Sequence, residues 1–270
     1  MPDPDGSGKH PRSLMMAARG KNIVLLHVKL KNAPGAMLSV VELVAKKHLN
    51  ILSGYHETPT GGEVGDWTFF MELRAEENLE QLLDSVRKLE FVVEASGQGP
   101  SNFLVDATHF PLLDQGERLI AFMAKSFIDV EKSFLGMMGR SGETILYHGG
   151  KAAGKVDLMR LRSWSGLRTN RELVEQFCKY CLVYGLGNST VQEFDEAKGF
   201  ASFIVRDSVE ASLYVERQAK GTCHFLRGMI AGVMEELFSR KADAKEVGCK
   251  AMGHEHCVFQ VTLGLEMPKT

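Results

Sequence analysis

The C-terminal third of this chain contains three segments rich in metal-binding side chains: Cys223-His224-Phe225, Glu246-Val247-Gly248-Cys249 and Gly253-His254-Glu255-His256-Cys257-Val258-Phe259. Together they hold three of the five cysteines, with acids and two histidines, all groups that bind a borderline metal such as zinc. The cysteines are separated by twenty-five and then seven residues, which is not a standard zinc spacing. A metal site therefore depends on a fold that brings the three segments together.

Length and composition set the frame for that fold. A chain of 270 residues is long enough for two domains, and 32 Lys plus Arg against 34 Asp plus Glu gives no basic field for nucleic acid. Five clustered cysteines favour a reducing compartment, so we expect a cytoplasmic protein. No run of eighteen apolar residues is present, which argues against a membrane partner, and residues 1–20 are expected to be a disordered tail.

The periodicity of the first third predicts a ferredoxin-like arrangement. Ile23 to Leu30 alternates as a strand does, Pro34 suits the first turn of a helix, and apolar residues then recur at helical spacing to Lys47. Further segments follow in the order strand, strand, helix, strand: Asn50–Glu57, Trp67–Leu73, a helix around Leu79–Val86, and Phe91–Ala95. The order is β-α-β-β-α-β, so the predicted fold class is α+β.

The same region resembles an ACT domain, over residues 21–97. The similarity lies in Val28-x-Leu30-x-Asn32-x-Pro34-Gly35-x-Met37, followed by Leu49-Asn50-Ile51. The resemblance implies pairing into a homodimer and binding of a small effector, often an amino acid, at Asn32, Ala33, Gly35, Ala36 and Met37. A helix N-terminus there suits a carboxylate. The alternative is a tight turn in a domain that only dimerises.

A hinge is predicted at residues 97–101, where Gly97-Gln98-Gly99-Pro100-Ser101 interrupts the pattern, and a mixed α/β domain at residues 101–265. In this domain we expect a short apolar segment at Thr144–Tyr147 that ends at His148-Gly149-Gly150, and separate helices at Val156–Leu161 and Glu172–Tyr184. A long helix, Cys223–Phe238, and a terminal hairpin should follow two more strands. Gly228 and Gly232 in that helix cost about 1 kcal/mol each against Ala, so a neighbouring element must approach closely.

The hairpin and the helix suggest how the cysteines meet. A thiolate at Cys223 would be stabilised by the helix dipole, and Cys249 and Cys257 lie on opposite arms of the hairpin. Glu246, His254 and His256 are the candidates for a fourth ligand. The alternative is that the three cysteines are simply small buried residues.

A second resemblance bears on this choice. The run Cys223-His224-Phe225-Leu226-x-Gly228-x-x-x-Gly232, with Glu246-x-x-Cys249-x-x-x-Gly253-x-x-x-Cys257-x-Phe259, is similar to the C-terminal signature of 4-vinyl-reductase-type (4VR) domains, which are related to eukaryotic trafficking-complex subunits and to sensor domains of aromatic-responsive activators. The resemblance implies zinc held by Cys223, Glu246, Cys249 and Cys257, with His254 and His256 as alternates. Four protein ligands make such a zinc structural. The tryptophan that aromatic-responsive sensors place on a preceding strand is missing between Phe200 and Asp207.

The chain offers no phosphate loop, catalytic triad or paired-carboxylate motif, and Cys178 and Cys181 are interpreted as helix-face residues. We therefore expect a small-molecule sensor or regulatory protein without catalytic residues. It would have a structural zinc, a ligand pocket in each domain (for an amino acid or an apolar or aromatic metabolite), and an output through a protein partner. Two alternatives are an enzyme or accessory protein in tetrapyrrole (vinyl) reduction and a scaffold subunit resembling trafficking-complex components.

Overall fold

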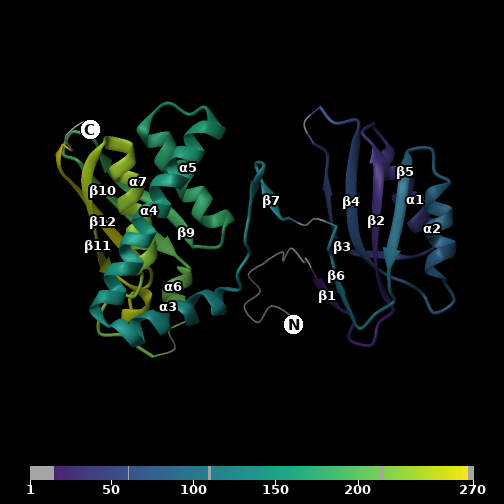
Figure 1. The fold of residues 1–270 in the computed structure, drawn as a ribbon, viewed down its shortest axis with the longest axis horizontal. Helices are drawn as coiled ribbons and strands as arrows, with labels where there is room; N and C mark the ends of the chain where they lie inside the picture. Colours follow the sequence, from purple (N-terminus) through teal and green to yellow (C-terminus); the bar gives the residue numbers. More distant parts are fainter. Residues whose placement is uncertain (1–14, 60, 109–110, 213, 215, 267–270) are drawn as a thin grey trace. The chain divides into compact units, whose positions relative to one another are not determined.

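The computed structural model describes residues 15–59, 61–108, 111–212, 214 and 216–266. The chain divides into two compact units, one ending at Leu119 and the other beginning at Ile120 (Figure 1). None of the helices in the described ranges is long and apolar enough to cross a membrane. Each unit has its own core, so the two are described separately.

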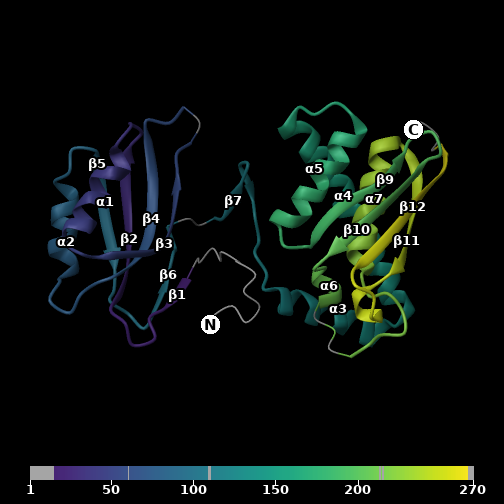
Figure 2. The same ribbon diagram turned by 180° about the vertical axis from the view of Figure 1, so that it is seen from behind.

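The first unit contains the predicted ferredoxin-like arrangement. Its four-stranded antiparallel sheet has the order β3-β4-β2-β5, and both helices lie on one face, as the two views in Figures 1 and 2 show. The elements are β2 (Ile23–Lys31), α1 (Ala36–Lys46), β3 (Asn50–Glu57), β4 (Val64–Glu72), α2 (Leu79–Arg87) and β5 (Val92–Gln98). The α+β class and this element order are confirmed.

Strand β2 is the centre of this unit because both of its faces are buried. Its alternate residues Val24, Leu26, Val28 and Leu30 pack beneath α1 and α2. The other face, represented by Ile23 and Leu25, contacts Phe70 and Leu104. Burial on both faces explains why this segment is nearly continuously apolar.

Part of the expected tail and part of the expected second domain belong to this unit. Met15–Ala17 forms strand β1, which pairs antiparallel with β6 (Phe103–Val105). A short hairpin of β7 (Leu113–Asp114) and β8 (Glu117–Arg118) follows. The boundary between the two units thus follows Leu119 and does not fall at the hinge expected at residues 97–101. Residues 1–14 of the expected tail lie outside the described residues.

The second unit packs helices on an antiparallel sheet of order β11-β12-β10-β9. The helices are α3 (Ala124–Met138), α4 (Arg140–Ser165), α5 (Asn170–Val183), α6 (Val209–Ser212) and α7 (His224–Phe238). The strands are β9 (Asn188–Asp195), β10 (Phe200–Arg206), β11 (Arg240–Gly248) and β12 (Cys257–Glu266), with a 3-10 turn, η1 (Lys250–Met252), between the last two. The long helix and the terminal hairpin agree with the prediction.

Helix α4 corrects one expectation. Residues 140–165 form one continuous helix, so the predicted break at His148-Gly149-Gly150 is wrong. Two glycines of this helix are needed for contact: a Cβ at Gly150 would overlap the Phe225 carbonyl oxygen, and one at Gly154 would overlap that of Met229. Gly228 and Gly232 face α4 in the same way, which confirms the close approach predicted from their spacing.

Candidate functional site: a cysteine-glutamate cluster beside an apolar cavity

Four side chains that the sequence singled out meet where α7, β11 and β12 come together. Cys223 is the residue just before α7, Glu246 lies on β11, Cys249 precedes η1, and Cys257 is the first residue of β12. One ligand atom from each lies within 4.8 Å of all the others. The structure therefore brings together the four residues of the predicted set.

The sulfur positions suit a tetrahedral metal. Cys223 Sγ lies 3.6 Å from Cys257 Sγ, which is 3.8 Å from Cys249 Sγ. Thiolates bound to zinc at the usual length are about 3.8 Å apart at tetrahedral angles. All three cysteines are fully buried and none is in a disulfide, and Glu246 Oε1 is buried without a hydrogen-bond partner. An orphaned carboxylate oxygen beside three thiols is a donor set that could hold a metal ion.

Hydrogen bonds from neighbouring groups orient these ligands. The Cys223 amide donates to Glu246 Oε2 at 3.1 Å, and the Lys250 amide donates to Cys257 Sγ at 3.4 Å. Ser208 Oγ lies 3.2 Å from Cys223 Sγ. Such outer contacts fix ligand direction and are typical of metal sites.

Proton sharing shows what the cluster is like without a cation. The hydrogen bond to Cys249 raises the pKa of Cys223 well above its usual value, while hydrogen bonds from Cys223 and Cys257 lower the pKa of Cys249. Burial raises the pKa of Glu246 to about 8. The cluster thus keeps protons on some of its donors, and a divalent cation would displace them on binding.

The two histidines offered as alternates are not members of this group. His254 is exposed, and its backbone amide donates to the Cys249 carbonyl oxygen at 3.2 Å. His256 Nδ1 lies 4.0 Å from a carboxylate oxygen of Glu255. Of the three candidates for the fourth position, Glu246 is the one that the fold places beside the cysteines.

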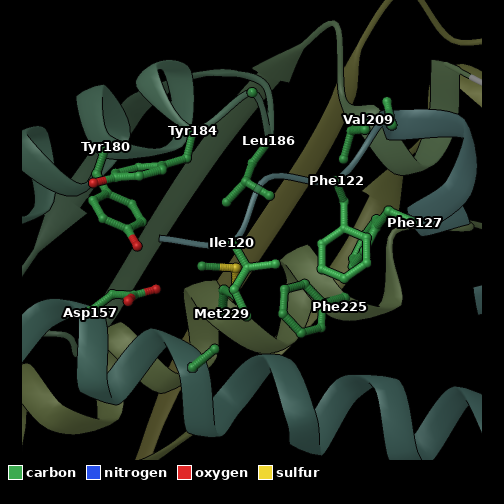
Figure 3. A pocket seen from close by; sticks show the side chains of 13 residues that line it. Ile120, Phe122, Phe127, Asp157, Tyr180, Tyr184, Leu186, Val209, Phe225 and Met229 are labelled. Carbon is green, nitrogen blue, oxygen red and sulfur yellow. The ribbon is translucent and has the colours of Figure 1, made fainter. Parts of the chain in front are cut away.

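An apolar cavity of about 380 Å³ lies in the same unit, between the start of α3, α4, α5 and α7 (Figure 3). Thirteen residues line it: Ile120, Phe122, Ala124, Phe127, Ala153, Asp157, Tyr180, Tyr184, Gly185, Leu186, Val209, Phe225 and Met229. Figure 3 shows Phe122, Phe127 and Phe225 gathered at one end and Asp157 with Tyr180 at the other. The cavity thus has an apolar end and a polar end.

The polar end is built from helices α4 and α5. Asp157 is only 6% exposed, and its Oδ1 lies 3.4 Å from Nη1 of Arg160. The rings of Tyr180 and Tyr184 lie 4.3 Å apart. Burial, with the nearby negative charge of Asp157, raises the pKa of Tyr180, so its hydroxyl keeps its proton at neutral pH.

The cluster and the cavity share structural elements. Helix α7 begins beside Cys223 and places Phe225 and Met229 in the cavity wall. Its first turn is capped by Glu210 of α6, whose carboxylate accepts hydrogen bonds from the Phe225 amide at 2.9 Å and the Leu226 amide at 2.7 Å. A metal in the cluster would therefore fix the helix that forms one wall of the cavity.

The predicted effector turn also has a cavity, of about 350 Å³, in the first unit. All five predicted residues line it, and Gly35, at the start of α1, has the left-handed φ of 88°. Sequence reasoning missed His56 and Thr58 of this lining, whose side chains lie 3.2 Å apart (His56 Nε2 to Thr58 Oγ1). Their place at the end of β3, which returns beside the turn, is the signal that could have found them.

Other predicted residues have structural positions. Cys178 and Cys181 lie on the buried face of α5, and burial raises the pKa of Cys178 to about 12, which suits an inert core thiol. Asp157 and Tyr180 were missed because they come from two helices that the sequence gives no reason to pair. A buried acid within the apolar face of α4 was the available signal.

Comparisons with known proteins concern mainly the second unit. Residues 202–263 match the vinyl-4-reductase (V-4-R) domain family, and this range contains three residues of the cluster in addition to Cys223. An uncharacterized protein of Methanocaldococcus jannaschii is 30% identical over 121 residues, which are 45% of this chain and 65% of that protein. The chain therefore spans less than two thirds of that relative's length.

Two solved structures are similar in fold. The phenol-responsive sensory domain of the transcription activator PoxR, solved with phenol, has a TM-score of 0.51 at 15% identity and covers 71% of this chain and 92% of its own. A vinyl-4-reductase family protein from Methanocaldococcus jannaschii has a TM-score of 0.33 at 20% identity and covers 54% of this chain and 99% of its own. The likeness to the sensory domain concerns the fold.

Proposed function

We propose that this protein is a small-molecule sensor whose second unit binds its ligand in the apolar cavity. The observation that carries the proposal is the cavity itself: about 380 Å³, walled by aromatic and aliphatic side chains, with Asp157 and Tyr180 as the polar groups at one end. Ligand sites are commonly of this size and composition. The fold likeness to a phenol-responsive sensory domain supports the same conclusion.

The metal in this proposal is a structural zinc ion. Cys223, Cys249 and Cys257 would supply thiolates and Glu246 a carboxylate oxygen, which completes a four-coordinate shell without an open position. When bound, the ion would supply cross-linking of α7 to the terminal hairpin and no Lewis-acid chemistry. The chain's own part is to hold the donors, through the amide hydrogen bonds of Cys223 and Lys250.

The first unit is proposed to be an ACT-like regulatory domain at residues 21–97 that pairs into a homodimer. Its ligand would be a small carboxylate such as an amino acid, bound at the start of α1 among the five predicted residues of the effector turn. The output would pass to a protein partner. Five free cysteines favour the reducing cytoplasm as the place where the protein works.

Native mass spectrometry of the full-length protein, purified without chelator, tests zinc content, retained small molecules and subunit number together. Thermal melts with phenol, phenethyl alcohol and phenethylamine then test the cavity. A Met229→Trp variant should fill the space and abolish any stabilisation, whereas Met159→Trp, on the exposed face of α4, should not. Absence of zinc would refute the metal proposal, and failure of every probe would refute the cavity proposal.

A further inference from the structure

The charge in the cavity points to a narrower class of ligand than an apolar molecule. Among the thirteen lining residues Asp157 is the single carboxylic acid, and none is Lys, Arg or His. Figure 3 shows its carboxylate directed toward the hydroxyl of Tyr180 at the edge of the empty space. An acid in an apolar, low-dielectric enclosure makes the potential inside it negative.

The nearby cations compensate that negative potential only in part. Arg160 approaches Oδ1 at 3.4 Å, which is long for a charge-assisted bond, and its side chain is 39% exposed, so water screens its charge. Lys151 and Lys155, on the same helix, lie 2.7 Å and 2.6 Å from the two carboxylate oxygens of Glu235. Their charges are therefore matched by another acid.

The aromatic rings beside Asp157 add to the same preference. Tyr180 and Tyr184 form a tilted pair with centroids 4.3 Å apart, and both line the cavity. The face of a tyrosine ring attracts an organic cation, most strongly where water is excluded. A buried carboxylate next to such rings is a combination suited to an ammonium group.

We propose that the ligand of this cavity is an arylalkylamine, with its ring among Phe122, Phe225 and Met229 and its ammonium group at Asp157. This inference rests on the proposed ligand-binding function. The ammonium donates hydrogen bonds to the carboxylate, and the opposite apolar end excludes a second charge. An anion of the same shape is repelled by Asp157, and a neutral alcohol donates one hydrogen bond without the charge.

Isothermal titration calorimetry on the full-length protein compares three probes of similar shape: phenethylamine, phenethyl alcohol and hydrocinnamate. We expect phenethylamine to bind at least about tenfold more tightly than the alcohol, and hydrocinnamate to show no binding. Asp157→Asn, which keeps the side-chain shape, should remove the preference for the amine and retain the alcohol. Asp129→Asn, at an exposed acid of α3 outside the cavity, is the matched control and should change nothing.

The results separate this inference from the function on which it rests. If the alcohol binds as tightly as the amine, or if the preference survives in Asp157→Asn, the amine assignment is wrong and the sensor proposal stands. If no probe binds, both are overturned. The wild-type comparison of amine and alcohol decides the question even where Asp157→Asn fails to fold.

Discussion

Gly221 is the residue whose small size allows Glu246 to reach the cysteines. A Cβ placed on Gly221 would overlap Oε2 of Glu246, although no ligand would be altered. We expect Gly221→Ala to displace the carboxylate and to weaken metal binding by about tenfold to a hundredfold, the usual cost of disturbing ligand orientation. Competition with a chromogenic chelator measures the affinity.

A glycine with room around it is the control for that variant. Gly264 lies on β12, and the nearest atom to the position that a methyl group would take is 3.5 Å away, so Gly264→Ala should keep the wild-type affinity. Equal metal affinity in Gly221→Ala and wild type would show that Glu246 is not a ligand.

Glu131 on α3 gives a pH dependence. Its Oε1 is buried without a hydrogen-bond partner, and burial raises the pKa of the carboxyl from 4.5 to about 7. The unfolded chain loses this proton near pH 4.5 and the folded chain only near 7, so the free energy of unfolding should fall as pH rises between these values, by roughly 3 kcal/mol in all.

The measurement is urea denaturation from about pH 4.5 to 8 on Glu131→Gln and wild type. The amide cannot ionise, so the variant should lose this part of the pH dependence and gain stability relative to wild type at the alkaline end. Asp129→Asn on the same helix, at an exposed position, should follow the wild-type curve. A Glu131→Gln curve parallel to wild type would contradict the burial argument.

At the scale of elements, the contact of α4 with α7 depends on paired glycines. A methyl group at Gly154 would overlap the backbone of Met229, whereas at Gly149, on the same helix, it meets nothing within 4 Å. Gly154→Ala should therefore destabilise the second unit by about 1–3 kcal/mol. Gly149→Ala should stabilise it by about 0.5–1 kcal/mol through helix propensity. Chemical denaturation checks both, and equal effects would show that the helices can move apart.

The same glycines explain what could be predicted from the sequence. The elements from Ile23 to Gln98 follow clear periods of two or 3.6 residues, so their order was predictable. The continuity of helix α4 was not, because the adjacent Gly149 and Gly150 favour a helix end by local rules. The role of Gly150 is a contact with a helix about 75 residues later, which no local pattern reveals.

The candidate site divides in a similar way. The cluster was predictable because metal ligands are few residue types and a family resemblance implied their roles. The cavity was not, because its lining comes from distant parts of the chain, from Ile120 to Met229, and most of it is ordinary apolar side chains. Packing, which the sequence does not specify locally, determines where a space remains.

At the scale of the whole molecule, the two units have separate hydrophobic cores, and the cluster belongs to only one of them. Removal of the metal should therefore lower the unfolding temperature of the second unit and leave that of the first unchanged. The two tryptophans report on this separately, because Trp67 is buried in the first unit and Trp164 lies at the end of α4 in the second.

Thermal melts followed by tryptophan fluorescence, with and without chelator, on Trp67→Phe and Trp164→Phe test this separation. The Trp164 signal should shift to lower temperature on metal removal, and phenethylamine should no longer raise it, because α7 then loses its attachment to the terminal hairpin. The Trp67 signal should not move. A shift of both signals would mean that the two cores unfold as one cooperative unit, and then the metal would stabilise the effector turn as well as the cavity.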